Sequence, residues 1–170
     1  KEVSQDTIKE ILQESTLAPS ASNGQPCRFI IISNKQMMKK LSDESKKNIL
    51  QDFAENKSST NPIYAELLKK EEFNVFYNAP CLIYIVGPVN TRNLHYDCSL
   101  AASYIMFSAV ERGLGTCWIN LGSQIRDPKL RAEIGLPDDC QIIAPLIIGY
   151  PKDIPAASQR HAPDILKIVV

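Results

Sequence analysis

The sequence lacks an excess of either charge, a strongly basic segment and a long apolar run. Its 170 residues carry 19 lysines and arginines against 19 aspartates and glutamates, so no strong field favours a polyanion or an acidic membrane. The longest nearly continuous apolar stretch, Cys98–Val110, is much shorter than the roughly 20 residues that span a bilayer. No basic run is interleaved with aromatic residues. We therefore expect neither nucleic acid nor a membrane as a partner.

The five cysteines are scattered and show no CxxC spacing. Zinc and iron–sulfur sites need clustered soft ligands, and His95 and His161 do not complete such a cluster, so we expect no metal. The first 13 residues contain no apolar core of a signal peptide. Buried or half-buried free thiols in a reducing compartment are the expectation, which places the protein in the cytoplasm. The cysteines are Cys27, Cys81, Cys98, Cys117 and Cys140.

The usual catalytic and nucleotide-binding motifs are also missing. No GxGxxG or GxxxxGK[ST] segment appears, and there is no GxSxG elbow or HExxH helix. His95 and Asp97 are two positions apart on an expected helix, so they face different directions. We assign no catalytic residue from the residue pattern alone.

Periodicity and turn residues predict alternating helices and strands within a single domain spanning residues 1–170. The connections are irregular in length, which favours an α+β or three-layer α/β sheet over a regular doubly wound fold. Polar residues 51–61 show no periodicity, and we expect a mobile surface segment there. The expected strands are Arg28–Ser33, Cys81–Val86, Thr116–Ile119 and Gln141–Tyr150. A first helix is expected after Ser4, which can cap it. Further helices are expected over Asn34–Leu50, Pro62–Leu68, Asn93–Arg112 and Asp127–Ile134.

Two features of this pattern point beyond a single chain. The helix over Asn93–Arg112 is apolar on nearly every face, so all its faces must be covered, and we expect part of it to pack against a second copy. The β-branched tail Ile165–Val170 is suited to strand addition, with a partner chain as one candidate acceptor. Within the fourth strand, Pro145 has no N–H for a ladder bond, which predicts a bulge there or an edge position.

The segment Ala18–Cys27 (APSASNGQPC) is the most informative stretch. It offers several short polar side chains within one turn, Gly24 should relax its backbone, and two prolines stiffen it. Such a loop is suited to a polar ligand with a ring. On chemistry alone, a plain connector between helix and strand is an equal alternative.

This loop, followed by a strand, resembles a segment of the FMN-dependent nitroreductase family. Three further segments match that family in the right order. They are Asn78-Ala79-Pro80 before a strand, Asp97-x-x-Leu-Ala on a long helix leading to Gly113-Leu114-Gly115-Thr116-Cys117-Trp118-Ile119, and Ile148-Gly149-Tyr150-Pro151 with Arg160 after it.

The resemblance implies a three-layer α/β/α fold with a mostly antiparallel central sheet, in an intertwined homodimer with two FMN sites at the interface. By correspondence with the family, one subunit would contact FMN through Pro19, Ser20, Ala21 and Asn23. The other would offer the backbone of Asn120, Leu121 and Gly122, where an N–H meets the flavin N5. Arg160 matches a basic position near the phosphate.

Two departures from the family stand out. Its Arg-Ser-x-Arg segment, which grips the FMN phosphate, is absent here. Either the sequence omits this N-terminal stretch or phosphate binding is weakened, and we favour the first. Cys27 stands where the family usually has an aromatic residue, and a packing substitution is favoured over a redox role.

The resemblance implies transfer of a hydride from NAD(P)H, through FMN, to a nitro compound, a quinone or a related small-molecule acceptor. FMN carries this chemistry, so no acid–base pair is needed. Aromatic residues of the middle region could form a lid over the site or simply pack in the core; they are Tyr64, Phe73, Phe76 and Tyr77. A dehalogenase-like flavin enzyme and a flavin-binding or redox-sensing module without turnover remain alternatives.

Overall fold

The computed structural model describes residues 2–169 and consists of a four-stranded sheet between two layers of helices. The helices and strands follow one another along the chain as α1 (Gln5–Ser15), β1 (Arg28–Ile32), α2 (Lys35–Ala54), α3 (Ala65–Lys69), β2 (Cys81–Pro88), α4 (Leu94–Glu111), β3 (Gly115–Trp118), α5 (Pro128–Glu133) and β4 (Cys140–Gly149). Three single turns of 3₁₀ helix join them: η1 (Ala21–Asn23), η2 (Pro62–Tyr64) and η3 (Asn120–Gly122).

The strands lie in the order β1-β2-β4-β3, and every pair is antiparallel. β2 and β4 are central, and seven of the eight residues of β2 are buried. β1 and β3 therefore form the two edges of the sheet. This order decides where the expected site residues lie, because the loop before β1 and the turn after β3 belong to opposite edges.

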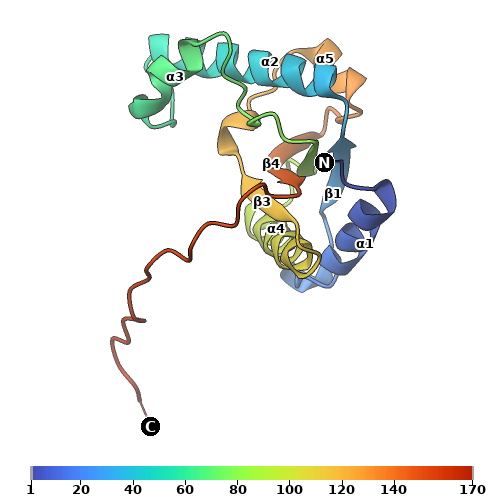
Figure 1. Cartoon of the computed structure of the whole chain (residues 1–170), viewed down its shortest axis with the longest axis vertical. Helices are drawn as coiled ribbons and strands as arrows, with labels where there is room; N and C mark the ends of the chain where they lie inside the picture. The colour runs from blue at the N-terminus through green and yellow to red at the C-terminus, as the bar shows by residue number, and fades with distance from the viewer. Residues whose placement is uncertain (1, 170) are drawn as a thin grey trace.

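The two faces of the sheet are covered by different helices, which gives the expected three layers (Figure 1). On one face, Ile11 of α1 and Ile105 of α4 pack against Ile83 of β2. On the other, Leu41 of α2 and Leu130 of α5 pack against the opposite side of β2. Alternation along the strand explains this division, since neighbouring residues of β2 point to opposite faces.

Most of the expected elements are present, and polar side chains cap the first turns of three helices. The Ser4 hydroxyl accepts a hydrogen bond from the Thr7 N–H at 3.0 Å, and Asn34 and Asp127 cap α2 and α5 in the same way. Gly113, at φ +69°, ends α4 with the backbone turn that glycine favours. The predicted α+β class is confirmed.

The expectation of a mobile surface segment over residues 51–61 is partly wrong, because α2 continues to Ala54. Asp52, in this extra turn, accepts a hydrogen bond at 2.9 Å from Arg126. The contact joins residues 74 positions apart, so helical periodicity alone could not reveal it.

Pro145 lies in an inner strand rather than at an edge, and the bulge lies two positions away. Ile85 pairs with Ala144 and Val86 with Ile142, which leaves Ile143 as the extra residue. The Pro145 carbonyl accepts from the Ile119 N–H at 2.8 Å, just past the end of β3. The ring nitrogen of Pro145 faces the same side as its carbonyl, toward Ile119. Because Ile119 lies beyond the end of β3, the missing N–H removes no hydrogen bond between paired residues of β3 and β4.

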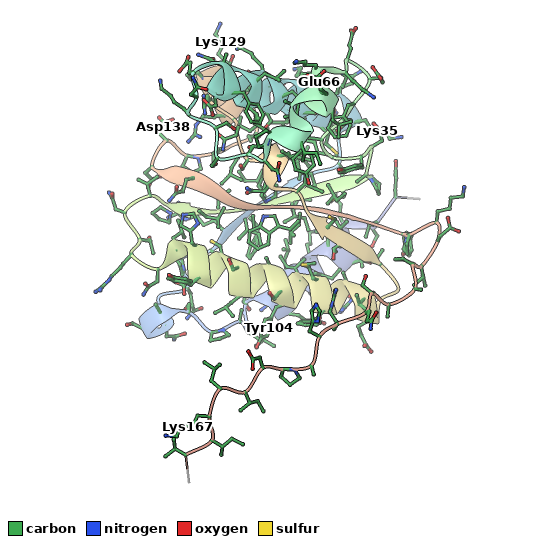
Figure 2. The ribbon with its side chains drawn as sticks, turned by 90° about the vertical axis from the view of Figure 1, so that its left-hand side faces the viewer. Lys35, Glu66, Tyr104, Lys129, Asp138 and Lys167 are labelled. Atoms are coloured by element: carbon green, nitrogen blue, oxygen red, sulfur yellow. The ribbon has the colours of Figure 1, made fainter. Side chains whose placement is uncertain are left out.

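One face of α4 is left uncovered by its own chain. Tyr96, Phe107 and Val110 are 73%, 76% and 68% exposed, whereas the opposite side of the helix, with Cys98, Ala102 and Ile105, is buried. Figure 2 shows Tyr104 on the same outer side of α4, away from the sheet. The tail after Gly149 leaves the body of the molecule as an exposed chain (Figure 1). Within residues 2–169, no helix is both long and apolar enough to cross a membrane.

Candidate functional site

The loop between α1 and β1 has an unusual backbone. Ser22, Asn23 and Gln25 have φ values of 52°, 53° and 46°, the left-handed region that non-glycine residues seldom adopt. Gly24, in contrast, has φ −71°, so the expectation that this glycine relaxes the turn is wrong. Left-handed backbone at three non-glycine residues persists only where the surroundings fix it, and such segments concentrate at functional sites.

Asp97 on α4 provides one of the contacts that fix this loop. Its carboxylate accepts a hydrogen bond from the Ala21 N–H at 2.9 Å, and the Asp97 residue is only 4% exposed. A buried carboxylate needs such a partner, because burial without one is costly. The first turn of α4 therefore determines where η1 lies.

Side chains of the loop also form hydrogen bonds with one another and with its backbone, and these bonds leave some polar groups of the loop without a partner. The Ser20 hydroxyl oxygen accepts from the Gln25 backbone N–H at 3.0 Å, and the Asn23 side-chain oxygen (Oδ1) accepts from the Gln25 side-chain amide at 3.2 Å. Among the described residues, the Ser20 O–H and the Asn23 NH₂ donate no hydrogen bond. Ala21, however, has both its N–H and its C=O engaged, by Asp97 and by Gly24.

Two hollows flank the loop. The larger, of about 570 Å³, lies between Ser22, Arg28 and Arg92, with Asp97 in its lining. The smaller, of about 180 Å³, is lined by Pro19, Ser20 and Cys27 and also reaches Asp97. The predicted contact residues Pro19, Ser20 and Ala21 thus border open space on both sides of a fixed loop.

The turn η3 after β3 is the second expected part of the site, and α2 fixes it. The buried Ser45 hydroxyl donates to the Leu121 carbonyl at 2.6 Å and accepts from the Gln124 N–H at 3.1 Å. From β2, the Tyr84 hydroxyl donates to the Gly122 carbonyl at 2.9 Å. Burial raises the pKa of Tyr84 above its usual range, so this phenol keeps its proton.

Gly122 is required for packing rather than for ligand contact. A Cβ at this position would come within 2.3 Å of the Phe76 ring. The Gly122 N–H donates to the Ile119 carbonyl, so both of its backbone groups are engaged. Among the described residues, by contrast, the N–H groups of Asn120 and Leu121 donate no hydrogen bond. These two amides are the donors that the turn offers to a ligand.

Within one chain, the loop and the turn do not meet. The loop precedes β1 and the turn follows β3, and three strand spacings of about 4.8 Å separate these edges, roughly 14 Å in all. They also favour opposite faces, since Asp97 of α4 holds the loop and Ser45 of α2 holds the turn. Arg160 lies in the exposed tail and contacts neither.

Comparison with known proteins identifies the family of this chain. The family model described as "Nitroreductase family" matches residues 1–150. The chain belongs to the nitroreductase family. A relative from Archaeoglobus fulgidus, assigned by name as an NADH dehydrogenase/NAD(P)H nitroreductase, is 27% identical over 96% of this chain and 85% of its own length.

Solved structures of the same fold agree with this membership. A nitroreductase with bound FMN from Bacteroides fragilis superimposes with a TM-score of 0.82 at 21% identity, over 100% of this chain and 89% of its own. An iodotyrosine deiodinase bound to FMN and 3-iodo-L-tyrosine gives 0.71 at 18% identity, covering 99% and 91%. At these identities, the structures establish the nitroreductase fold of this chain.

Several residues that shape the site in this nitroreductase-family chain were not predicted. Ser45 and Asn48 hold the segment around η3, and both lie on the buried side of α2. Their spacing from Met38 and Leu41 is that of an apolar helical stripe. Polar residues at those positions were therefore the available signal. Nothing in the local sequence indicated the bond between Asp97 and Ala21.

The aromatic residues proposed as a lid divide into two groups. Phe76 is fully buried and packs edge-on against Tyr84, so it belongs to the core. Tyr77 is 58% exposed, has φ 53°, and meets the half-buried Phe73 ring edge-on at 5.7 Å. Tyr64 is also exposed. Only Tyr64 and Tyr77 present substantial ring surface to the outside.

Proposed function

We propose that the protein is an FMN-dependent oxidoreductase that passes a hydride from NAD(P)H to a nitro compound, a quinone or a related small acceptor. The single observation that carries the proposal is the pair of fixed segments, η1 and η3, which keep unused hydrogen-bond donors at opposite edges of the sheet. Membership of the nitroreductase family supports it, as does the FMN in the structure from Bacteroides fragilis.

The free groups of the two segments fit FMN. A flavin ring and its ribityl chain carry both donors and acceptors, and Ser20 and Asn23 offer the O–H and NH₂ that the loop leaves unused. Asn120 and Leu121 offer N–H groups for the acceptor nitrogens of the ring. Pro19, Ala21 and Gly122 would contribute contact surface, because the polar groups of Ala21 and Gly122 are already engaged. FMN, when bound, supplies the hydride chemistry.

The site requires a homodimer, since the loop and the turn are on opposite edges of the sheet. The uncovered face of α4, with Tyr96, Phe107 and Val110 exposed, is the surface on which we expect the copies to meet. The tail after Gly149 would then pack on the partner and bring Arg160 to the FMN phosphate, where a guanidinium can bind two oxygens at once. Residues 1–170 act as one domain in this arrangement.

The described residues need no acid–base pair for this reaction. Their contribution is to orient the flavin and to leave room for a donor and then an acceptor, with Tyr64 and Tyr77 as exposed aromatic surface between α2 and β2. Four of the five cysteines are buried or half-buried thiols, as expected, whereas Cys117 is exposed. Free thiols support a place in the reducing cytoplasm.

The deciding experiment is stopped-flow reduction of FMN-loaded protein. Mixing with NADH or NADPH under anaerobic conditions should bleach the flavin absorbance, and a quinone or nitroaromatic acceptor added next should restore it. If neither nucleotide reduces the flavin, the oxidoreductase proposal fails. If bleaching occurs but only a halogenated aromatic restores the colour, the dehalogenase alternative replaces the proposed acceptor class.

A second experiment tests the loop directly. Asn23→Ala should weaken FMN retention several-fold, because it removes the free NH₂ of the loop, and equilibrium dialysis measures this. Asn34→Ala is a matched control, since Asn34 caps α2 and belongs to neither segment. Equal FMN retention in the Asn23 variant and the wild type would indicate that the loop is only a connector.

A further inference from the structure

Two cysteines of different elements lie sulfur to sulfur beside the loop. The Sγ atoms of Cys27, just before β1, and Cys98, on the second turn of α4, are 3.6 Å apart. A disulfide needs about 2.05 Å between the sulfurs, so an approach of about 1.5 Å would join them. The two residues are 71 positions apart in the chain, and no sequence spacing indicates the pair.

The surroundings of the pair suit controlled oxidation. Cys98 is fully buried, whereas Cys27 is half-buried and lines the hollow of about 180 Å³ next to Pro19 and Ser20. A molecule of peroxide size can reach Cys27 through that hollow. The other thiols are different: Cys81 and Cys140 are buried, and Cys117 is exposed. Among the described cysteines, no other sulfur pair is in contact.

The two thiols also differ in acidity. The hydrogen bond between them lowers the pKa of Cys27, although partial burial and the nearby Asp97 carboxylate oppose this. The same hydrogen bond, together with burial, raises the pKa of Cys98. When Cys27 ionises, Cys98 is therefore the thiol that keeps its proton and donates it across the pair. The accessible sulfur is the better nucleophile, which is the order a two-step oxidation needs.

We propose that Cys27 and Cys98 form a redox-active dithiol, oxidised by hydrogen peroxide to an intrachain disulfide that fixes the loop of η1 to α4. In the first step, the Cys27 sulfur attacks a peroxide oxygen, the O–O bond breaks, and Cys27 becomes a sulfenic acid with release of one water. In the second, the Cys98 sulfur attacks Cys27, the S–O bond breaks, and a second water leaves. Two thiols and one peroxide give one disulfide and two waters, and a dithiol reductant reverses the change.

A disulfide between Cys27 and Cys98 should restrict the movement of the loop that Asp97 already holds. Asp97 precedes Cys98 on α4 and holds the Ala21 N–H at 2.9 Å, while Cys27 ends the same loop. A bond between Cys27 and Cys98 adds a covalent link where a hydrogen bond now holds the loop. Opening of η1 away from α4 should become rarer, and amide exchange at Ala21 should slow. This inference does not depend on the flavin chemistry, so it can fail or succeed independently of the proposed function.

The test uses the full chain treated with one to two equivalents of hydrogen peroxide after removal of reductant. Thiol titration in denaturant should show the loss of two of the five thiols, and mass spectrometry of unreduced peptides should find the Cys27 peptide joined to the Cys98 peptide. Dithiothreitol should restore both thiols. Hydrogen exchange at Ala21 should be several-fold slower in the oxidised protein.

Single-cysteine variants complete the test. Cys27→Ser should abolish the paired thiol loss, and Cys117→Ser, which removes the exposed thiol, should leave it unchanged. If Cys98→Ser fails to fold, the peptide map of the wild type and the Cys27→Ser variant, at a half-buried position, still test whether the two cysteines pair. Equal loss of two thiols in Cys27→Ser, a disulfide that joins two chains through Cys117, or unchanged Ala21 exchange after cross-linking would each overturn the proposal.

Discussion

Replacing Ser45 by alanine tests whether α2 holds the turn after β3. The hydroxyl is fully buried and makes two bonds to η3 and its continuation, donating to the Leu121 carbonyl and accepting from the Gln124 N–H. Ser45→Ala leaves both backbone groups without these partners. Ser42, one turn earlier and equally buried, makes a single such bond, to the Val75 N–H at 3.0 Å. Ser42→Ala is therefore a matched control with one bond fewer.

The expected difference follows from the count of unpaired groups. Each buried backbone group that loses its partner costs about 1–3 kcal/mol. Leu121 and Gln124 are half-buried, which favours the lower part of that range. We expect Ser45→Ala to lower the free energy of unfolding by about 1–2 kcal/mol more than Ser42→Ala. For a chain of this size, that corresponds to about 2–8 °C in Tm.

The assay is urea unfolding of the flavin-free protein, followed by far-UV circular dichroism at a single protein concentration, since oligomers and bound ligands shift apparent stability. Flavin retention provides a second readout, and we expect it to fall more in Ser45→Ala than in Ser42→Ala. Equal free energies of unfolding for the two variants would refute the assignment of two stabilising bonds to Ser45.

Three further predictions concern contacts outside η3. Hydrogen bonds from Arg112 lower the pKa of the exposed Glu14 carboxyl, so the stability that Glu14→Gln removes should be full at neutral pH. It should fade as the pH falls below 4.5 and through the lowered folded value; a pH-independent difference in urea midpoints would contradict this. Asp97→Ala should speed hydrogen exchange at Ala21, and Asp97→Asn, which keeps an acceptor oxygen, should largely restore protection; equal exchange in both would exclude the tether. Phe107→Asp should give monomers in sedimentation with little change in monomer stability, and intact dimers would exclude the α4 face.

The sequence was most informative where a local rule decides the structure. Ser4, Asn34 and Asp127 cap helices because their side chains reach the free N–H groups of the first turn, and Gly113 ends α4 at a positive φ. These rules depend on only a few neighbouring residues. The family motifs added the layers and the antiparallel sheet, which local rules do not determine.

The misjudged features depend on contacts between distant residues. Local propensity assigns a positive φ to Gly24, but the bonds of Asp97 and Ser20 place it on Ser22, Asn23 and Gln25 instead. For the candidate site, the sequence singled out two segments, whose role stays a prediction, but it could not indicate which of their groups remain free. Whether Ala21 and Gly122 can bind through polar atoms depends on partners up to 76 positions away.

The separation of η1 and η3 makes a prediction that only a shared site can satisfy. Asn120→Pro removes one free N–H at little structural cost, because Asn120 is the first residue of η3, donates no bond there, and proline suits a first helical position. A copy with Asn23→Ala is defective only in its loop, and a copy with Asn120→Pro only in its turn. In a mixed dimer, one site combines both defects and the other combines neither.

Equal amounts of the two variants, exchanged to equilibrium, should therefore regain wild-type FMN affinity at about a quarter of all sites, since half of the dimers of a two-fold assembly are mixed. Titration by flavin fluorescence quenching would resolve this tight class from the weakened sites. A site built within one chain predicts a different result, because each copy then keeps its own single defect. Binding curves of the mixture that equal the average of the two separate variants would show that the loop and the turn serve the same subunit, and would remove the reason for a shared site.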